Sequence, residues 1–353
     1  MNESTKINLK GLTRQELVRH LAGIGKERYR ADQIIRWLYL QRITDIELMS
    51  NLSRSCRERL EAFAYIGQIA CLREQVAQDG TRKYLFQLND GHTIETVLIG
   101  DKGRLTLCLS TQVGCRMGCS FCLTGHSGFE RQLSAAEIVD QVIQIAEIID
   151  AGGSARGAIT NIVLMGMGEP LDNLEEVIKA LEIMKYADGL QFSSRRITLS
   201  TCGLAPQIIE LGQRLEVSLA ISLNAAYDTL RSQLMPINRR YNLTALMAAC
   251  RSYPHTNQRR ITFEYILFAG LNDSLDDARR LVELIGSLPA KINLIPFNEH
   301  PELSFKKPQQ KQITDFMEYL QRHHLTVMTR RSKGADISAA CGQLREAAGG
   351  KSQ

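Results

Sequence analysis

The sequence has no long apolar run. Within its 353 residues, no stretch approaches the ~18 consecutive apolar residues that a membrane-spanning helix needs. The first eight residues, MNESTKIN, also lack the apolar core of a secretory signal peptide. These two absences predict a cytoplasmic protein that has no membrane partner.

The cysteines lack the spacing of a disulfide scaffold. There are nine, an odd number, scattered at positions 56, 71, 108, 115, 119, 122, 202, 250 and 341. In a long chain without a secretion signal, such cysteines more often bind metal or take part in catalysis than form structural bridges. The sequence therefore favours a metal-binding or catalytic use for some of them.

Positive charge is in excess at one end of the chain only. The net charge of +5 arises within residues 1–83, which carry 15 Lys or Arg against 10 Asp or Glu, whereas residues 84–353 carry 28 of each. A basic lobe beside a neutral body is compatible with attraction to a polyanion such as RNA. An ordinary solvated surface is the alternative. The side chains that suit RNA contact are Lys26, Arg28, Arg30 and Arg36, interleaved with Tyr29, Trp37 and Tyr39, and the later group Arg330, Arg331 and Lys333.

Apolar periodicity predicts three structured regions and a tail. Residues 1–67 predict a helical domain, with helices at 12–21 (Thr13 and Glu16 forming a capping box), 30–39 and 52–63. Residues 68–100 predict a β-hairpin, 83–88 and 93–99, with an Asp-Gly turn. Residues 101–344 alternate strands (160–165, 196–200, 216–222, 260–267, 291–295) with helices (134–149, 173–186, 204–212, 274–285), and 345–353 predict a flexible tail. The alternation predicts an α/β fold with parallel strands, either a partial (β/α)6 barrel or a doubly wound sheet.

Three cysteines lie close together directly after an apolar strand-like run, residues 105–110. Cys115, Cys119 and Cys122 have the spacing C-x3-C-x2-C. Thiolates on one loop can converge on an iron–sulfur cluster, and three of them leave one iron of a [4Fe–4S] cluster open for a small molecule. A zinc site completed by His126, or three buried thiols, are the alternatives.

Polar residues follow four of the predicted strands. They are Gly166-Met-Gly-Glu-Pro170, Ser200-Thr-Cys-Gly203, Ser222-Leu-Asn224 and Asn298. In both candidate folds, ligands gather at the carboxyl ends of parallel strands. The sequence therefore predicts one ligand site around the cysteine loop.

At this point the chain resembles a known family, the RlmN/Cfr family of radical S-adenosylmethionine (SAM) RNA methyltransferases. The resemblance runs from about residue 12 to residue 344. It rests on RYRADQI (28–34), ETV (95–97), the cysteine loop, GFERQL (128–133), MGMGEP (165–170), SLN (222–224), KINLIP (291–296) and DISAACGQL (336–344). It implies the partial radical-SAM barrel rather than the flat sheet.

The resemblance also implies roles for individual residues. Cys115, Cys119 and Cys122 match the ligands of a [4Fe–4S] cluster. Cys341 matches a cysteine that becomes S-methylated, Cys108 its transient disulfide partner, and Glu95 a proton acceptor. Positions that match the lining of the SAM pocket are Gly168, Glu169, Ser200, Ser222, Leu223, Asn224 and Asn298.

The implied reaction is methylation of adenine C2 in 23S rRNA and in some tRNAs. A first SAM methylates Cys341, and a second SAM gives a 5′-deoxyadenosyl radical that activates the S-methyl group for addition to C2. The implied partners are the two RNAs and an electron donor such as flavodoxin or ferredoxin, and the chain is expected to be a monomer. Methylation at adenine C8, as in Cfr-type enzymes, and a radical SAM activase or maturase acting on protein are the alternatives.

Overall fold

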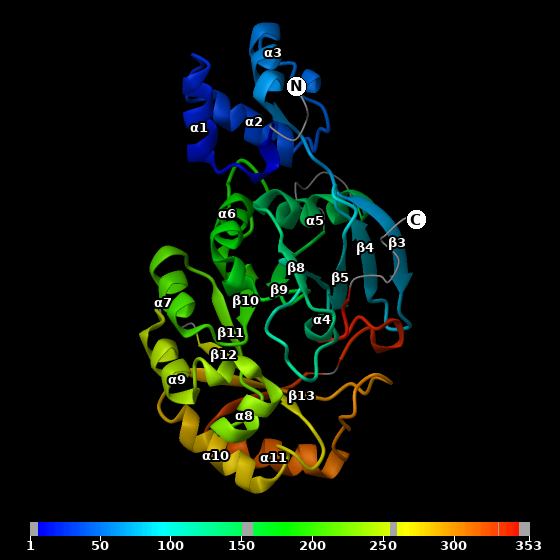
Figure 1. Ribbon diagram of the computed structural model, residues 1–353, viewed down its shortest axis with the longest axis vertical. Helices are drawn as coiled ribbons and strands as arrows, with labels where there is room; N and C mark the ends of the chain where they lie inside the picture. Colours follow the sequence, from blue (N-terminus) through cyan, green and yellow to red (C-terminus); the bar gives the residue numbers. More distant parts are fainter. Residues whose placement is uncertain (1–5, 150–157, 255–259, 331, 346–353) are drawn as a thin grey trace.

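One ten-stranded sheet organises the molecule. The computed structural model describes residues 6–149, 158–254, 260–330 and 332–345 (Figure 1). The strand order is β14-β13-β12-β11-β10-β9-β6-β5-β4-β3. The strands from β6 to β14 pair in parallel: β6 (Arg104–Cys108), β9 (Asn161–Leu164), β10 (Ile197–Thr201), β11 (Ser218–Ser222), β12 (Ile261–Leu267), β13 (Ala290–Pro296) and β14 (Thr326–Thr329). An antiparallel part, β3 (Ala70–Val76), β4 (Arg82–Gln87) and β5 (Thr93–Asp101), continues the sheet beyond β6.

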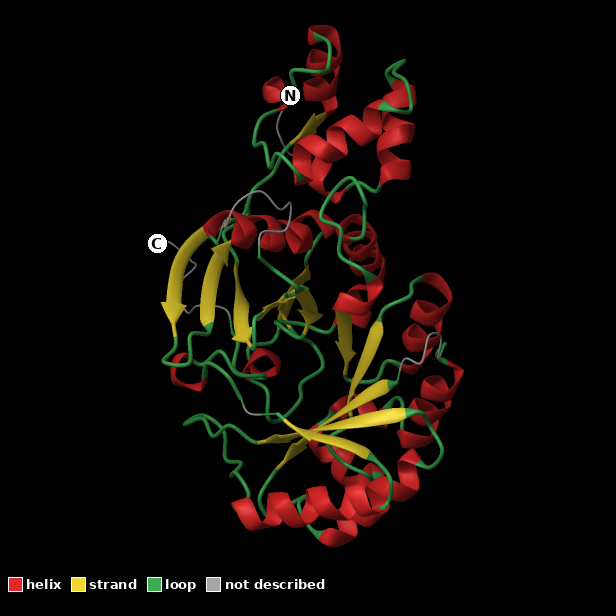
Figure 2. Ribbon diagram, turned by 180° about the vertical axis from the view of Figure 1, so that it is seen from behind, coloured by secondary structure: helices red, strands yellow, loops and turns green. Residues whose placement is uncertain are grey.

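Helices between the parallel strands cover the outer face of the curved sheet (Figure 2). They are α5 (Ala135–Ile148), α6 (Leu174–Met184), α7 (Ala205–Arg214), α8 (Asp228–Leu234), α9 (Leu243–Ser252), α10 (Leu275–Ile285) and α11 (Gln310–Arg322). A helix after each strand returns the chain to the same edge, so neighbouring strands are parallel and their carboxyl ends meet. The predicted α/β fold with a partial barrel of parallel strands is confirmed. No helix of the described residues is both long and apolar enough to cross a membrane.

The sequence missed several elements. The edge strand β3 is almost wholly exposed, and β14 has only four residues, so neither carries a clear apolar pattern. The sequence also gave no indication of α8, α9 or α11. The barrel therefore extends one strand further than expected, to β14, and the predicted hairpin β4–β5 has a third antiparallel strand.

Three short helices form a lobe at one end of the molecule (Figure 1). They are α1 (Arg14–Gly23), with the expected Thr13–Glu16 capping box, α2 (Arg30–Tyr39) and α3 (Arg54–Phe63). The short strands β1 (Ile7–Asn8) and β2 (Ala64–Tyr65) pair in parallel within it. Lys10 joins this lobe to the barrel, because its Nζ lies 2.5 Å from Asp140 Oδ1 of α5 and both side chains are buried.

The aromatic and basic side chains of this lobe differ in their freedom to bind RNA. Tyr39 is fully buried and its hydroxyl donates to Lys10 O, so it cannot stack on a base. Trp37 is half-buried and donates to Asn51 Oδ1, and Arg36 pairs with Asp188. Tyr29 is 52 % exposed. Of the aromatic side chains in the expected RNA-binding group, Tyr29 therefore has the most free surface.

Candidate active site

A cavity of about 880 Å³, open to solvent, lies at the carboxyl ends of the parallel strands. The cysteine loop, the five strands β9 to β13 and the C-terminal segment all contribute to its wall. The lining residues include Cys115, Cys119, Cys122, Gly168, Glu169, Ser200, Cys202, Ser222, Asn224, Glu264 and Cys341. The fold thus collects residues far apart in sequence at one place, as expected for this edge of a parallel sheet.

The three cysteines of the loop face this cavity together. The loop begins after β7 (Gln112–Gly114) and ends where Cys122 caps the short helix α4 (Leu123–His126). Burial raises the pKa of the Cys115 thiol to about 12 and that of Cys119 well above its ordinary value. These thiols hold their protons unless a cation displaces them, which is the behaviour of thiolate metal ligands. Three soft donors from one loop, with open space before them, fit a [4Fe–4S] cluster.

His126 does not support the zinc alternative. It lies in the last turn of α4, where its side chain is exposed. A structural zinc site is normally closed by four protein ligands. Glu169 and Cys202 are other potential ligands in the cavity wall, but Glu169 already accepts hydrogen bonds at both carboxylate oxygens.

A two-stranded ribbon sets the position of the loop. β7 pairs antiparallel with β8 (Phe129–Gln132), and Gly114 has a φ of 71°. A Cβ atom at Gly114 would lie 2.0 Å from Gly128 O. The neighbouring Cys115 N–H donates to this same carbonyl over 2.6 Å. Only glycine permits this approach, which fixes the backbone immediately before the first ligand.

Gly114→Ala is expected to prevent cluster assembly, because the methyl group forces the ribbon apart at Cys115. Iron and sulfide content after anaerobic reconstitution should fall at least about fivefold, since metal binding needs preformed ligand geometry. Gly128→Ala is the matched control: its φ of 81° is also positive, but a Cβ there meets nothing within 4 Å. Full loading of Gly114→Ala would show that the close approach does not position the loop.

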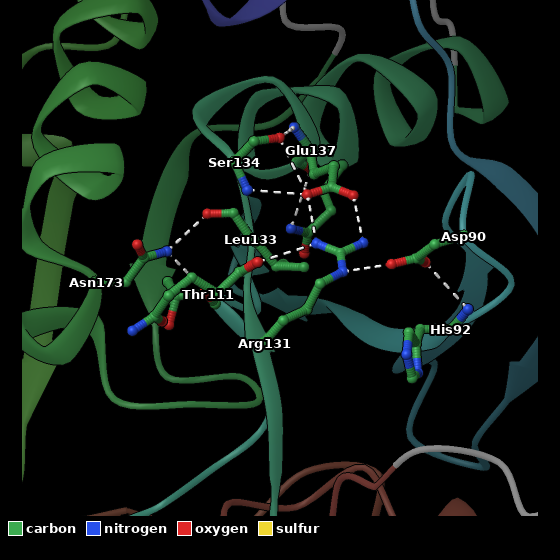
Figure 3. A network of polar contacts seen from close by, with 10 residues as sticks. Asp90, His92, Thr111, Arg131, Leu133, Ser134, Glu137 and Asn173 are labelled. Atoms are coloured by element: carbon green, nitrogen blue, oxygen red, sulfur yellow. Dashed lines mark hydrogen bonds and ion pairs between the residues drawn. The ribbon is translucent and has the colours of Figure 1, made fainter. Parts of the chain in front are cut away.

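Arg131 of β8 ties the ribbon to two other elements (Figure 3). Its guanidinium pairs with Asp90, in the turn between β4 and β5, and with Glu137, in the first turn of α5. Glu137 also accepts from Ser134 to complete the capping box of α5. Nearby, Asn173 Nδ2 donates to the carbonyls of Thr111 and Leu133. The ribbon is therefore held on both flanks, as a ligand-bearing loop requires.

The structure brings five of the seven expected SAM-pocket residues to the cavity wall: Gly168, Glu169, Ser200, Ser222 and Asn224. The other two lie nearby without lining it. Leu223 is fully buried, with its N–H bonded to Glu264 O. Asn298 follows β13 and donates from Nδ2 to Ser332 Oγ over 2.6 Å. Asn224 also uses its side chain within the protein, since its Oδ1 accepts from Ile266 N.

Two backbone N–H groups, one after β9 and one after β10, fix the carboxylate of Glu169. Its Oε1 accepts from Leu171 N and its Oε2 from Cys202 N, at 3.0 and 2.8 Å. Burial nevertheless raises the pKa of the carboxyl group. Gly168 precedes it with a φ of 98°, and a Cβ there would lie 2.5 Å from Gln112 Cβ. The Gly-Glu pair therefore packs against β7, beside the cysteine loop.

The C-terminal segment carries Cys341 to the cysteine loop. Leu123 N–H donates to Gly342 O over 2.7 Å, and Thr124 Oγ1 donates to Leu344 O. Both donors belong to α4, which directly follows Cys122. The Cys341 thiol is reached by solvent from the cavity, although protein surrounds it on the other sides and burial raises its pKa.

Cys341 also lines a second, smaller cavity of about 300 Å³, together with Cys108 from the end of β6. Cys108 is buried, and burial raises the pKa of its thiol to about 12, with the charge of Arg330 acting in the opposite direction. Two thiols separated by 233 positions in sequence thus face one space, and both are free of disulfide bonds.

Glu95 of β5 is buried beside the C-terminal segment. Its Oε1 lies 2.9 Å from Lys83 Nζ of β4, and its Oε2 accepts from Arg345 N. Lys83 is buried as well and also donates to Ser338 O. The carboxylate therefore sits in a polar contact that links the antiparallel strands to the segment that carries Cys341.

Sequence reasoning missed Glu264 and Arg231. It placed Cys202 in a predicted strand-end motif and Arg330 in the group that suits RNA contact, without a role for either in this cavity. Glu264 and Cys202 line the main cavity, Arg330 lines the smaller one, and Arg231 lies behind the strand ends. Glu264 stands between Phe263 and Tyr265 in a largely apolar strand. A carboxylate in such a strand is a signal, but the sequence does not show whether its side chain faces the cavity or solvent. Arg330 lines the smaller cavity with the two thiols, and its side chain is 34 % exposed, so its contact with RNA phosphate stays a prediction. Arg331 lies outside the described residues.

Comparison with known proteins identifies the family. Residues 7–66 match the family described as "Ribosomal RNA large subunit methyltransferase N-terminal domain", and residues 109–285 match the radical SAM superfamily. The dual-specificity RNA methyltransferase RlmN of Geobacter sulfurreducens is 52 % identical over 341 residues, which cover 97 % of this chain and 92 % of that protein. RlmN of Geotalea uraniireducens is 51 % identical, covering 96 % and 97 %.

A solved structure agrees with these relatives. The crystal structure of a radical SAM methyltransferase from Sphaerobacter thermophilus has a TM-score of 0.87 and 43 % identity, and the match covers 96 % of this chain and 99 % of that one. The radical SAM superfamily uses a [4Fe–4S] cluster and SAM, which confirms the two expected cofactors. Together with the cavity and its three thiols, these matches establish that the chain belongs to the RlmN family of radical SAM methyltransferases.

Proposed function

We propose that this enzyme methylates C2 of adenosine in RNA, at the peptidyl-transferase centre of 23S rRNA and in some tRNAs. The observation that carries the proposal is the placement of Cys341 in the wall shared by two cavities. One cavity presents the three thiols expected to hold the cluster, and the other presents Cys108. This arrangement suits a thiol that first accepts a methyl group and later releases its product by disulfide exchange.

The chemistry requires a carrier because C2 of adenine is electron-poor and does not attack the methyl group of SAM directly. The cluster with SAM supplies the radical chemistry that activates an otherwise inert methyl group. The cluster is held by Cys115, Cys119 and Cys122. The SAM pocket is formed or backed by Gly168, Glu169, Ser200, Ser222, Leu223, Asn224 and Asn298. Cys341 carries the methyl group, and Cys108 frees the product by attacking the sulfur of Cys341.

Glu95 is the proposed acceptor of the C2 proton. Its contact with Lys83 keeps it fixed beside the C-terminal segment, and only one backbone donor occupies its other oxygen. A base must come within about 3 Å of the proton that it removes, and such contacts often form only once substrate is bound. We infer that RNA binding releases the Arg345 N–H contact and turns this oxygen toward the base.

The remaining partners follow from the same proposal. Residues 1–67 form the RNA-binding domain, 68–100 an extension of the sheet, 101–344 the catalytic barrel, and 345–353 a tail. Flavodoxin or ferredoxin supplies electrons, and the enzyme acts as a monomer in the cytoplasm, where its RNA substrates are made.

Product analysis tests the proposal. Anaerobically reconstituted enzyme is incubated with SAM and a reductant, and with either an rRNA fragment or a tRNA transcript. The digested RNA is then examined by mass spectrometry against authentic standards. We expect 2-methyladenosine from both RNAs. Release of 8-methyladenosine would assign a Cfr-type reaction, and SAM cleavage without any RNA product would indicate a different substrate, such as a protein.

A further inference from the structure

Glu264 of β12 has an unusual environment for a carboxylate. Its side chain is buried, and its Oε2 accepts from Ser200 Oγ over 3.1 Å. Its Oε1 is buried without a hydrogen-bond partner. The nearest cation is Arg330, whose Nη1 lies 4.0 Å from this oxygen, beyond hydrogen-bond distance. Burying an ionised oxygen without a close partner is costly. Burial accordingly raises the pKa of the Glu264 carboxyl group, and the charge of Arg330 acts in the opposite direction.

Arg330 stands between this carboxylate and the two thiols. It follows β14 and its N–H donates to Leu294 O, which anchors the backbone to β13. Its side chain lines the smaller cavity with Cys108 and Cys341. The charge of Arg330 favours the ionised forms of both thiols, and they in turn raise the pKa of the guanidinium. Arg330 is thus a cation shared by one carboxylate and two sulfur atoms.

We propose that Arg330 is a positioning residue for the disulfide-forming step, in which its guanidinium, 4.0 Å from Glu264, stabilises the thiolate of Cys108 as it attacks the sulfur of Cys341. This inference rests on the proposed function, because it assigns a role within that reaction. It gives Arg330 a purpose other than contact with RNA phosphate.

The step balances in atoms and electrons. In the covalent intermediate, the sulfur of Cys341 is bonded to the methylene group carried by adenine C2. The Cys108 thiolate attacks that sulfur and forms the S–S bond, while the S–CH2 bond breaks and leaves its electron pair on the methylene carbon. A proton then completes the methyl group. The two sulfurs have been oxidised to a disulfide, and the same two electrons have reduced the transferred carbon.

The charge of Arg330 matters because only the thiolate attacks. Burial raises the pKa of Cys108 to about 12, so the thiol form predominates at neutral pH even with Arg330 present. A neighbouring cation shifts such a pKa by about 1–3 units. Loss of the positive charge should therefore slow disulfide formation by about 10- to 1000-fold. Because the same charge favours the thiolate of Cys341, methylation of Cys341 is expected to slow as well, so the disulfide step is timed on enzyme whose Cys341 is already methylated.

The test follows a single turnover with Arg330→Gln, Arg330→Lys and Cys108→Ala. The readouts are the +14 Da mass of the Cys341 peptide, the fraction of protein covalently joined to RNA, and the dissociation constant for RNA. We expect Arg330→Gln enzyme that already carries the methyl group on Cys341 to bind RNA normally but to accumulate the covalent adduct, as Cys108→Ala does. Arg330→Lys keeps the charge and should clear the adduct faster than Arg330→Gln. Arg322→Gln, an exposed arginine of α11 paired with Glu318, is the matched control.

Three outcomes would overturn the inference. Clearance of the adduct by Arg330→Gln at the wild-type rate would show that the charge of Arg330 does not assist disulfide formation. Weakened RNA binding with no adduct would assign Arg330 to phosphate contact instead. If Cys108→Ala also formed no adduct, the pairing of the two thiols would itself be wrong, and the proposed function would fail together with the role of Arg330.

Discussion

Cys341→Ala is expected to reduce RNA methylation at least about 10⁴-fold while leaving iron content and SAM binding at wild-type levels. Removal of a covalent carrier eliminates the reaction route rather than weakening one contact. The cluster survives because its three thiols come from residues 115–122, and the C-terminal segment is held to α4 through the carbonyls of Gly342 and Leu344, which Cys341→Ala leaves in place. Methyl transfer, iron content and SAM affinity should be measured on the same preparation.

Cys108→Ala distinguishes the role of Cys108 from that of Cys341. The carrier remains, so this variant should form the bond to RNA and then stop, because nothing can attack the sulfur of Cys341. A stable protein–RNA species on a denaturing gel is the expected result. Cys250→Ala, which removes another fully buried free thiol in α9, should turn over normally. Normal turnover by Cys108→Ala would refute its assignment as the disulfide partner.

Arg231→Met is expected to have the largest effect on stability and to abolish SAM binding. Arg231 is fully buried on α8 and donates to Cys202 O, Ser222 O and Leu223 O, the carbonyls that end β10 and β11. It also donates to Asn238 Oδ1. Loss of these bonds leaves buried carbonyl oxygens without donors, each costing about 1–3 kcal/mol. We therefore expect a loss of at least about 4 kcal/mol in folding free energy.

This effect is measured as the midpoint of thermal unfolding of the apoprotein, which should fall by about 8 °C or more. Arg279→Met provides the control, because Arg279 is an exposed arginine that pairs with Asp276 and Glu283, and its loss should leave the unfolding midpoint close to that of the wild type. If Arg231→Met unfolded at the wild-type temperature and bound SAM, the strand ends would not depend on this buried cation.

The sequence predicted the elements whose signals are local. The capping box at Thr13 and the Asp-Gly turn depend on neighbouring residues, and the structure places a helix and a hairpin there. The cysteine loop was evident for the same reason, since its spacing is short. Strands with weak patterns, β3 and β14, gave no such signal because one is a polar edge and the other is very short.

The buried charges of the site could not be predicted in this way. Glu264 and Arg231 look like ordinary charged residues in sequence, and only the tertiary fold buries them. Arg330 is less buried, but the fold brings it to the cavity shared by the two thiols. The two buried side chains are each held by hydrogen-bond partners from other elements: Ser200 for Glu264, and the carbonyls of two strand ends for Arg231. The pairing of Cys108 with Cys341 followed from family resemblance, because nothing in the spacing of these two residues indicates that they share a cavity.

Labelled SAM gives the most direct measurement of methylene transfer through Cys341. The reconstituted enzyme is given SAM with a CD3 group and an rRNA fragment that spans the peptidyl-transferase adenosine, and the digested RNA is analysed by mass spectrometry. Transfer through Cys341 predicts 2-methyladenosine with two deuterons and one solvent proton in the new methyl group. Retention of all three deuterons would contradict it, because an intact methyl group would then have moved without passing through a methylene bound to sulfur.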